Sequence, residues 1–170
     1  MHPTLTMHPL RWLCFLLLSA TLAVAASVEA LANQKIVVLG DSITQGGGYV
    51  SFMDYYLQRL RPQARFELYP LGLSSETVSG LSEPGHAGGK FARPCLSERL
   101  PRVLEKMKPD VVFACYGMND GIYFPFAEER FAKFREGMVR LREKVTAARA
   151  TLVHVTPPVF DPVPIARSEE

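Results

Sequence analysis

Short apolar runs alternate along this chain with longer segments in which apolar residues recur every three or four positions. Residues 35–39 form an apolar, β-branched run that is typical of a buried parallel strand. Runs of the same kind occupy three later segments, residues 66–71, 110–116 and 151–156. Because segments with helical periodicity separate these runs, the pattern predicts an α/β fold with a parallel sheet and right-handed crossovers.

Three segments carry the helical periodicity. They cover residues 49–60, 96–107 and 126–149. The first of them has apolar side chains at spacings of three and four: Tyr49, Phe52, Met53, Tyr56, Leu57 and Leu60. The many charged residues of the last segment are expected to form a solvated helix face, which needs no binding partner.

The first 32 residues have the pattern of a secretory signal peptide. Arg11 precedes an apolar run over residues 12–26, and Ala30-Leu31-Ala32 forms a small-x-small cleavage pattern. We therefore predict cleavage after residue 32, export to the periplasm or the cell exterior, and one mature domain over residues 33–170. The alternative is an uncleaved anchor, although the run is short for a membrane span. After cleavage no stable membrane span is expected.

Composition narrows the classes of partner. The 170 residues carry a formal net charge of +2 and no basic stripe interleaved with aromatics, so a nucleic-acid partner is not expected. The histidines and cysteines lack zinc-ligand spacing, so no metal site is predicted. Cys95 and Cys115 remain after cleavage and either pair in an oxidising compartment or stay free.

Loops that carry candidate chemistry follow the first three predicted strands. Ser42 follows the first, residues 72–77 follow the second, and Asn119 follows the third. Because the carboxyl ends of parallel strands share one sheet edge, these loops are expected to form a ligand site. A serine hydroxyl there is a nucleophile or merely a helix cap, and an asparagine amide is an oxyanion donor or merely a turn residue.

The glycine cluster at residues 46–48 does not predict a phosphate site. It has neither the dinucleotide spacing nor the Gly-Lys-Ser/Thr ending of phosphate-binding loops. The longest irregular segment, residues 82–94, is either a substrate-flanking loop or a solvated excursion. Lys90 and Arg93 within it are interpreted as solvated surface charges.

Two of these segments resemble a known family. Gly40-Asp41-Ser42-Ile43 and Gly117-Met118-Asn119-Asp120 are similar to the first and third sequence blocks of the SGNH (GDSL-type) esterases and lipases, and the resemblance runs from about residue 35 to residue 158. It implies a three-layer α/β/α sandwich of flavodoxin-like topology with strand order 2-1-3-4-5.

The resemblance also implies a chemistry. The substrate would be a small-molecule or carbohydrate carboxylic ester, as for a carbohydrate acetylesterase or a lysophospholipase, and it would be hydrolysed without metal or organic cofactor. Ser42 would be the nucleophile and contribute its backbone N–H to the oxyanion hole, Asn119 would donate through its side chain, and Gly117 would shape the turn that supports Asn119. The family's second block has a glycine as a further N–H donor; Ser75 stands at that position here, with Gly72 as the alternative donor.

The base of the family is a histidine three residues after an aspartate, and this sequence contains no Asp-x-x-His. His154 is predicted to lie in the middle of a strand, and the segment around His86 shows no acidic partner. We therefore expect the front part of a longer esterase, without the fifth strand and last helix and with little activity. The alternative is a non-catalytic carbohydrate- or envelope-binding module on the same scaffold.

Overall fold

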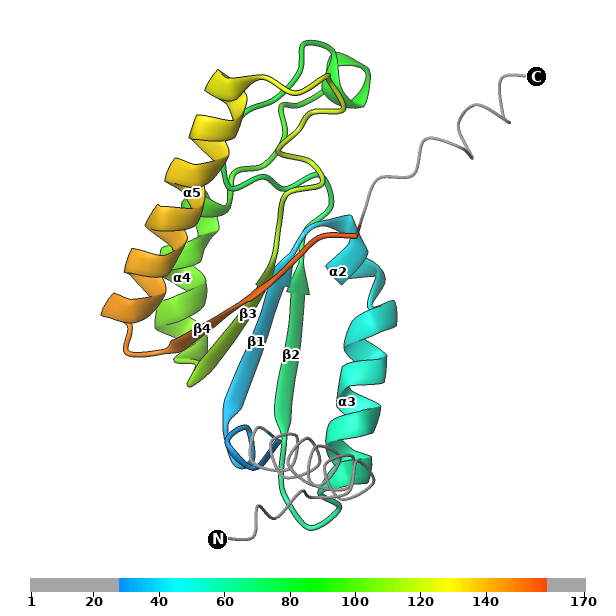
Figure 1. Ribbon diagram of the computed structural model, residues 1–170, viewed down its shortest axis with the longest axis vertical. Coiled ribbons are helices and arrows are strands. Elements are labelled where there is room, and N and C mark those ends of the chain that lie inside the picture. Colours follow the sequence, from blue (N-terminus) through cyan, green and yellow to red (C-terminus); the bar gives the residue numbers. More distant parts are fainter. Residues whose placement is uncertain (1–27, 159–170) are drawn as a thin grey trace, which may run out of the picture.

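The computed structural model describes residues 28–158, which form a four-stranded parallel sheet with helices on both faces (Figure 1). The strands are β1 (Lys35–Gly40), β2 (Glu67–Gly72), β3 (Val111–Cys115) and β4 (Thr151–Val155). Their order is β2-β1-β3-β4, and each neighbouring pair is parallel. The predicted α/β class and the predicted order of these four strands are confirmed.

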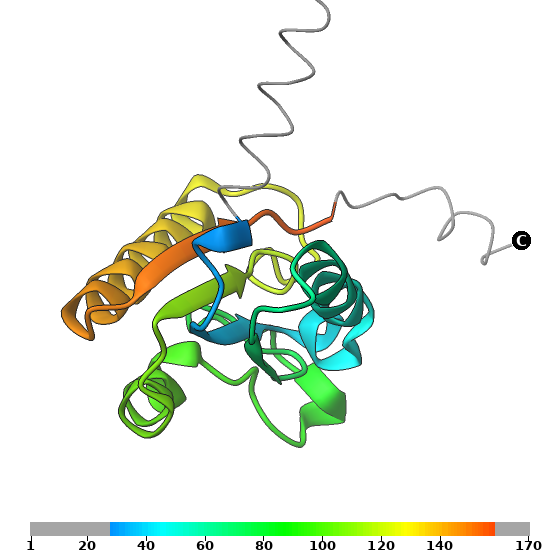
Figure 2. The same cartoon turned by 90° about the horizontal axis from the view of Figure 1, so that it is seen from below.

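The helices form one layer on each side of the sheet. Helix α3 (Gly48–Leu60) covers one face, and α4 (Leu96–Met107) and α5 (Glu128–Ala147) cover the other; Figure 2 shows the same layers from below. Two short elements complete the described part, α2 (Ser42–Gly46) and a 3₁₀ helix, η1 (His86–Gly89). The three long helices lie within two residues of their predicted bounds.

Strand β1 explains how one apolar run serves two cores. Val37 and Leu39 pack into the cluster beneath α4 and α5, whereas Ile36 and Val38 pack into the cluster beneath α3. All four side chains are fully buried. A central strand with helices on both faces must be apolar at every position, because successive side chains point to opposite faces.

The buried face of helix α3 contains fewer of its apolar residues than the periodicity predicts. Val50 and Leu57 are buried against the sheet and Met53 packs beside them, but Phe52 is 67% and Tyr56 is 55% exposed. The apolar residues of this segment occupy two adjacent stripes, and only the stripe at positions 50, 53 and 57 reaches the sheet. Within residues 28–158 no second long helix lies beside α3 on this face, so the second stripe stays exposed.

The two edges of the sheet have different chemistry. Strand β2 forms one edge and contains Pro70, which is exposed and lies opposite Val38 in the ladder. Proline has no backbone N–H, so strands that contain it are confined to edges. Strand β4 forms the other edge and contains no proline.

The segment before β1 packs against the domain. Val28 is buried in the cluster beneath α3, Glu29 forms an ion pair of 2.9 Å with Arg61, and the Asn33 N–H donates to the Arg65 oxygen at 2.8 Å. Most of the predicted signal peptide, residues 1–27, lies outside the described residues. Among residues 28–158, no helix has the length and apolarity that crossing a membrane requires.

Candidate active site

Ser42 begins helix α2, directly after the buried end of β1. The Asp41 carboxylate caps this short helix by accepting the Ile43 N–H at 3.0 Å, and Asp41 itself is buried. Burial raises the pKa of Asp41, although the N–H groups that it accepts act in the opposite direction. Ser42 is exposed, and its hydroxyl bonds to no other residue in the described part of the chain. The hydroxyl is therefore open to a solute.

The loop after β2 is held against the first loop. The Leu73 N–H donates to the Gly40 oxygen at 2.9 Å, and the Ser74 N–H donates to Oε1 of Gln45 at 2.6 Å. A Cβ on Gly72 would collide with the backbone of Gln45, so only glycine allows α2 to approach β2 this closely. The role of Gly72 seen in the structure is this close approach.

Ser75 adopts the backbone conformation that a glycine would adopt at its position. Its φ is +65°, in the left-handed region that non-glycine residues seldom occupy. Within residues 28–158 its N–H donates no hydrogen bond. Serine at this position thus preserves a backbone N–H that is free to bind a ligand.

Asn119 and Asp120 are buried and attach the loop after β3 to the loop after β2. Nδ2 of Asn119 donates to the backbone carbonyl oxygen of Glu76 at 3.2 Å. Oδ1 of Asp120 accepts the N–H groups of Val78 at 3.0 Å and Ser79 at 2.8 Å. Burial raises the pKa of Asp120, and the N–H groups of Ser79 and Val78 reduce that rise.

Gly117 makes the turn that leads into Asn119. Its φ is +134°, and a Cβ on it would lie 3.1 Å from Cγ of Pro157, so a side chain would be strained there. The predicted turn role of Gly117 therefore has a steric basis. The three loops were predicted to meet at the carboxyl ends of the strands, and hydrogen bonds join them there.

A buried ionic group lies beneath the second loop. Glu76 is fully buried and accepts Nε and Nη2 of Arg99, each at 2.6 Å, and the Tyr116 hydroxyl at 2.5 Å. Burial and the nearby Glu76 carboxylate raise the pKa of Tyr116. This group was not predicted from the sequence, because its members come from a loop, helix α4 and the end of β3. The only local signal was an acidic residue within an otherwise uncharged loop.

The long loop carries a second ionic group. Arg93 is buried, which corrects its interpretation as a solvated charge, and it donates to both carboxylate oxygens of Glu83 at 2.7 Å. The Glu83 carboxylate also accepts the Nδ1–H of His86 at 3.1 Å, so His86 does have an acidic neighbour. Nε2 of His86 is buried and bonds to no other described residue.

The remaining candidate positions carry no site in this part of the chain. His154 lies within edge strand β4 and is exposed. Cys95 and Cys115 are both free thiols, and burial raises the pKa of Cys115. Within residues 28–158 no cluster of histidine, cysteine and acidic side chains could hold a metal ion.

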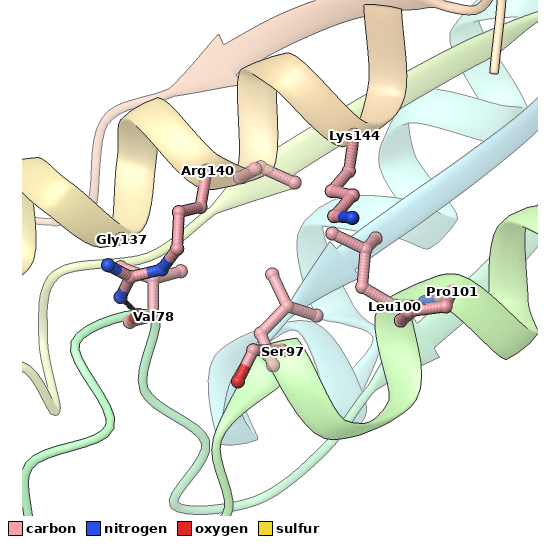
Figure 3. A pocket seen from close by; sticks show the side chains of 9 residues that line it. Val78, Ser97, Leu100, Pro101, Gly137, Arg140 and Lys144 are labelled. Carbon is pink, nitrogen blue, oxygen red and sulfur yellow. Dashed lines mark hydrogen bonds between the residues drawn. The ribbon is translucent and has the colours of Figure 1, made fainter. Parts of the chain in front are cut away.

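Two cavities differ in size and place. The larger, about 520 Å³, adjoins the third loop and the end of β4; it is lined by Gly117, Met118, Gly121, Tyr123, Phe124, Pro125, Pro157 and Pro158. The smaller, about 60 Å³, lies between α4 and α5 near Val78, Leu100 and Gly137 (Figure 3). Ligand pockets measure roughly 300–1,000 Å³, so the larger of these two cavities has room for an ester. Hollows of similar size, about 360 Å³ beside α3 and β2 and about 470 Å³ along α5, also occur.

Comparison with known proteins agrees with this arrangement. The family model of the GDSL-like lipase/acylhydrolase family matches residues 38–170. An arylesterase of Vibrio mimicus is 31% identical over 106 residues, which are 62% of this chain and 48% of that protein. The chain thus spans about half the length of this relative.

Solved structures share the fold. One is the acetylxylan esterase Axe2 of Geobacillus stearothermophilus, with a TM-score of 0.57, 22% identity, and coverage of 74% of this chain and 60% of that one. Its solved forms include catalytic mutants of a serine, an aspartate and a histidine. Another is the α/β hydrolase LAE5 from the metagenome of Lake Arreo, with a TM-score of 0.58, 23% identity, and coverage of 77% and 63%.

Proposed function

Since the chain belongs to the GDSL-like lipase/acylhydrolase family, we propose that it hydrolyses carboxylic esters with Ser42 as the nucleophile. The observation that carries the proposal is the joining of three loops at one sheet edge. The first loop bonds to the second through Gly40 and Leu73, and the second bonds to the third through Glu76 and Asn119. A hydroxyl, free loop N–H groups and a carboxamide at the carboxyl end of the sheet are the nucleophile and the oxyanion donors of acyl transfer.

In the proposed reaction, Oγ of Ser42 attacks the ester carbonyl carbon and the carbonyl oxygen becomes an oxyanion. The N–H groups of Ser42 and Ser75 and Nδ2 of Asn119 donate to that oxyanion, with Gly72 as the alternative to Ser75. A base takes the Ser42 proton as the new C–O bond forms and passes it to the leaving alkoxide. The tetrahedral intermediate thereby expels the alcohol and leaves an acyl group on Ser42. Attack by water on this acyl-serine forms a second tetrahedral intermediate, which releases the acid and frees the hydroxyl.

The proton acceptor for Ser42 is the missing part of this mechanism. No aspartate in the 170 residues is followed by histidine three positions later, and Nε2 of His86 is buried without a hydrogen-bond partner among residues 28–158. Loss of a triad base lowers turnover by on the order of 10⁴–10⁶ in serine proteases. We accordingly expect slow turnover from these 170 residues, and rescue by a base supplied in solution.

The proposed substrates are small acyl esters of a sugar or aromatic alcohol. The cavity of about 520 Å³ beside Gly117 is bordered by Tyr123 and Phe124, whose side chains are 59% and 55% exposed. Exposed aromatic rings bind flat apolar faces, which both kinds of alcohol present. Two similar proteins have names that indicate esters of these two kinds, an acetylxylan esterase and an arylesterase.

We further propose that the protein is exported, with processing earlier than after residue 32. Cleavage after residue 32 would remove Val28 from the core beneath α3 and break the Glu29–Arg61 ion pair. Ala23-Val24-Ala25 offers a second small-x-small pattern, whose use would keep both contacts. Mass spectrometry of the secreted chain should give a first residue before Val28; a first residue at Asn33 would contradict this.

The test of the proposed function combines two assays. Imidazole also hydrolyses p-nitrophenyl acetate without protein, so the protein-free rate at each imidazole concentration is subtracted. The remaining turnover should rise with imidazole, which acts as a general base, in the natural protein but not in Ser42→Ala. A fluorophosphonate probe should label Ser42 when imidazole is present. The matched control is Ser51→Ala, which removes an exposed serine of α3 and should change neither assay.

Two outcomes would overturn the assignment. Equal imidazole-dependent turnover in the natural protein and Ser42→Ala would remove Ser42 from the reaction. Absence of both turnover and labelling in the folded natural protein would instead favour the non-catalytic binding module.

A further inference from the structure

Arg93 is buried although it comes from a surface loop. Its side chain is only 5% exposed, whereas Lys90 and Phe91 in the same loop are exposed. Arginine cannot lose its proton in proteins and has only donors, so a buried guanidinium must find acceptors for its N–H groups. The acceptors that Arg93 finds therefore indicate the role of the loop.

Two N–H groups of Arg93 are taken by an acid and a third by an amide. Nε and Nη2 bond to the two oxygens of Glu83, each at 2.7 Å, and Nη1 donates to Oδ1 of Asn119 at 3.0 Å. The Arg93 hydrogen bond is the main cause that lowers the pKa of Glu83 to about 2, so the pair stays charged at neutral pH. The guanidinium is thereby fixed in position by Glu83 and directed at Asn119.

This contact permits one orientation of the Asn119 side chain. With Oδ1 on Arg93, Nδ2 faces the second loop and donates to the Glu76 oxygen at 3.2 Å. A flipped amide would place its N–H groups against a guanidinium that can only donate and its oxygen against the Glu76 oxygen. Both contacts would be repulsive, so Arg93 and Glu76 together lock the amide.

The charge of Arg93 also changes the amide as a donor. A cation bonded to Oδ1 draws electron density toward that oxygen, which leaves the N–H groups more positive. Hydrogen bonds that share a polarised group strengthen one another in a buried network. One hydrogen of Nδ2 is taken by Glu76, and the other has no acceptor among the described residues.

We propose that Arg93 is a positioning residue for the esterase reaction: it fixes and polarises the Asn119 carboxamide so that the second Nδ2 hydrogen is presented to the oxyanion. This inference rests on the proposed function. It also gives the long loop, residues 82–94, a role in the site: the loop holds the buried Arg93 guanidinium against Oδ1 of Asn119. Arg93 acts through Asn119 and need not touch the substrate.

The test is a double-mutant cycle on imidazole-supported turnover of p-nitrophenyl acetate. Removing a whole oxyanion donor costs on the order of 10²–10³ in kcat, so loss of its orientation alone in Arg93→Gln should cost roughly 10-fold, with KM changed less than about twofold. Arg93→Lys keeps the charge without the fork and should lose less. Arg102→Gln, which removes an exposed arginine of α4, is the matched control and should keep full turnover.

The decisive variant combines Arg93→Gln with Asn119→Ala. If Arg93 works only through the amide, the double variant is no slower than Asn119→Ala alone, whereas a merely structural role makes the two losses multiply. Multiplying losses, or an Arg93→Gln variant as fast as Arg102→Gln, would overturn the inference while leaving Ser42 as nucleophile. Absence of both turnover and fluorophosphonate labelling in the natural protein would overturn the proposed function instead.

A second measurement does not depend on turnover. In ¹⁵N-labelled protein, the side-chain NH₂ signals of Asn119, identified by their loss in Asn119→Ala, should move in Arg93→Gln and Arg93→Lys and stay in place in Arg102→Gln. Signals that are unchanged in folded Arg93 variants would show that the guanidinium does not set the state of the amide, and the inference would be wrong.

Discussion

The two sides of the proposed site are built differently. Ser42 is exposed on a five-residue helix, and its hydroxyl has no partner in the described chain. Asn119 is 4% exposed and is held at both ends of its amide by Arg93 and Glu76. The difference matches the two tasks: a nucleophile must move toward a carbon, whereas donors to an oxyanion work best when they are fixed in advance. Substitutions in the buried side should therefore mainly lower the free energy of unfolding. Substitution of the exposed Ser42 should mainly lower turnover.

The largest expected effect comes from the buried side. Arg99→Met leaves Glu76 buried without its ion-pair partner, which typically costs about 3–5 kcal/mol in the free energy of unfolding. Urea denaturation should show this loss. On the exposed side, Ser42→Ala should change the free energy of unfolding by less than about 0.5 kcal/mol while abolishing turnover. Equal destabilisation by the two changes would contradict the comparison.

A smaller effect is expected at Ser75, which lies between the two sides. A β-branched residue is disfavoured at a φ of +65°, so Ser75→Val should lower the free energy of unfolding by about 1–2 kcal/mol. Ser75→Gly relieves the same strain and should be neutral or slightly stabilising, with its N–H and turnover retained. A loss of turnover in the glycine variant would show that the hydroxyl of Ser75 takes part in the reaction.

The smallest effect concerns the pH dependence of stability. Burial raises the pKa of Asp120 above 3.8, so just above pH 3.8 the folded carboxyl keeps a proton that the unfolded one has lost. The free energy of unfolding therefore falls as pH rises from that value until the folded group ionises. Asp120→Asn keeps an oxygen for the Val78 and Ser79 N–H groups and should fall less over this range.

The measurement is the difference between the two proteins in urea titrations across acidic pH. Glu83 has a lowered pKa but is present in both proteins, so its effect cancels in the difference. Asp41 also has a raised pKa, and its charge adds to the rise at Asp120, so the difference reports Asp120 together with its interaction with Asp41. Parallel pH curves would show that Asp120 does not titrate differently in the folded chain.

Local patterns predicted most of the fold. The strands and long helices were found because a buried parallel strand and an amphipathic helix each impose a period on neighbouring residues. The exposed Phe52 and Tyr56 were assigned to the buried face of α3, since periodicity cannot tell how many neighbours a helix has. The short helix at Ser42–Gly46 was not separated from the loop, because five residues are too few to show a period.

The site was predictable only in its outline. The shared strand edge followed from parallel topology, so Ser42 and Asn119 could be assigned to the same side of the sheet. Arg93 could not be assigned to Asn119, because that contact spans 26 positions and depends on how an irregular loop folds back. For the same reason Arg99 on α4 gave no sign of its partner Glu76 in the second loop.

Pro70 makes the two edge strands unequal as sites where a further strand can pair with the sheet. Along β2, the missing N–H interrupts the row of donors that an incoming chain would need, whereas β4 has a continuous row. A further strand, whether from a fusion partner or from another molecule in a concentrated sample, can therefore extend this sheet only beside β4. Charged substitutions meant to keep the recombinant protein monomeric belong on that strand.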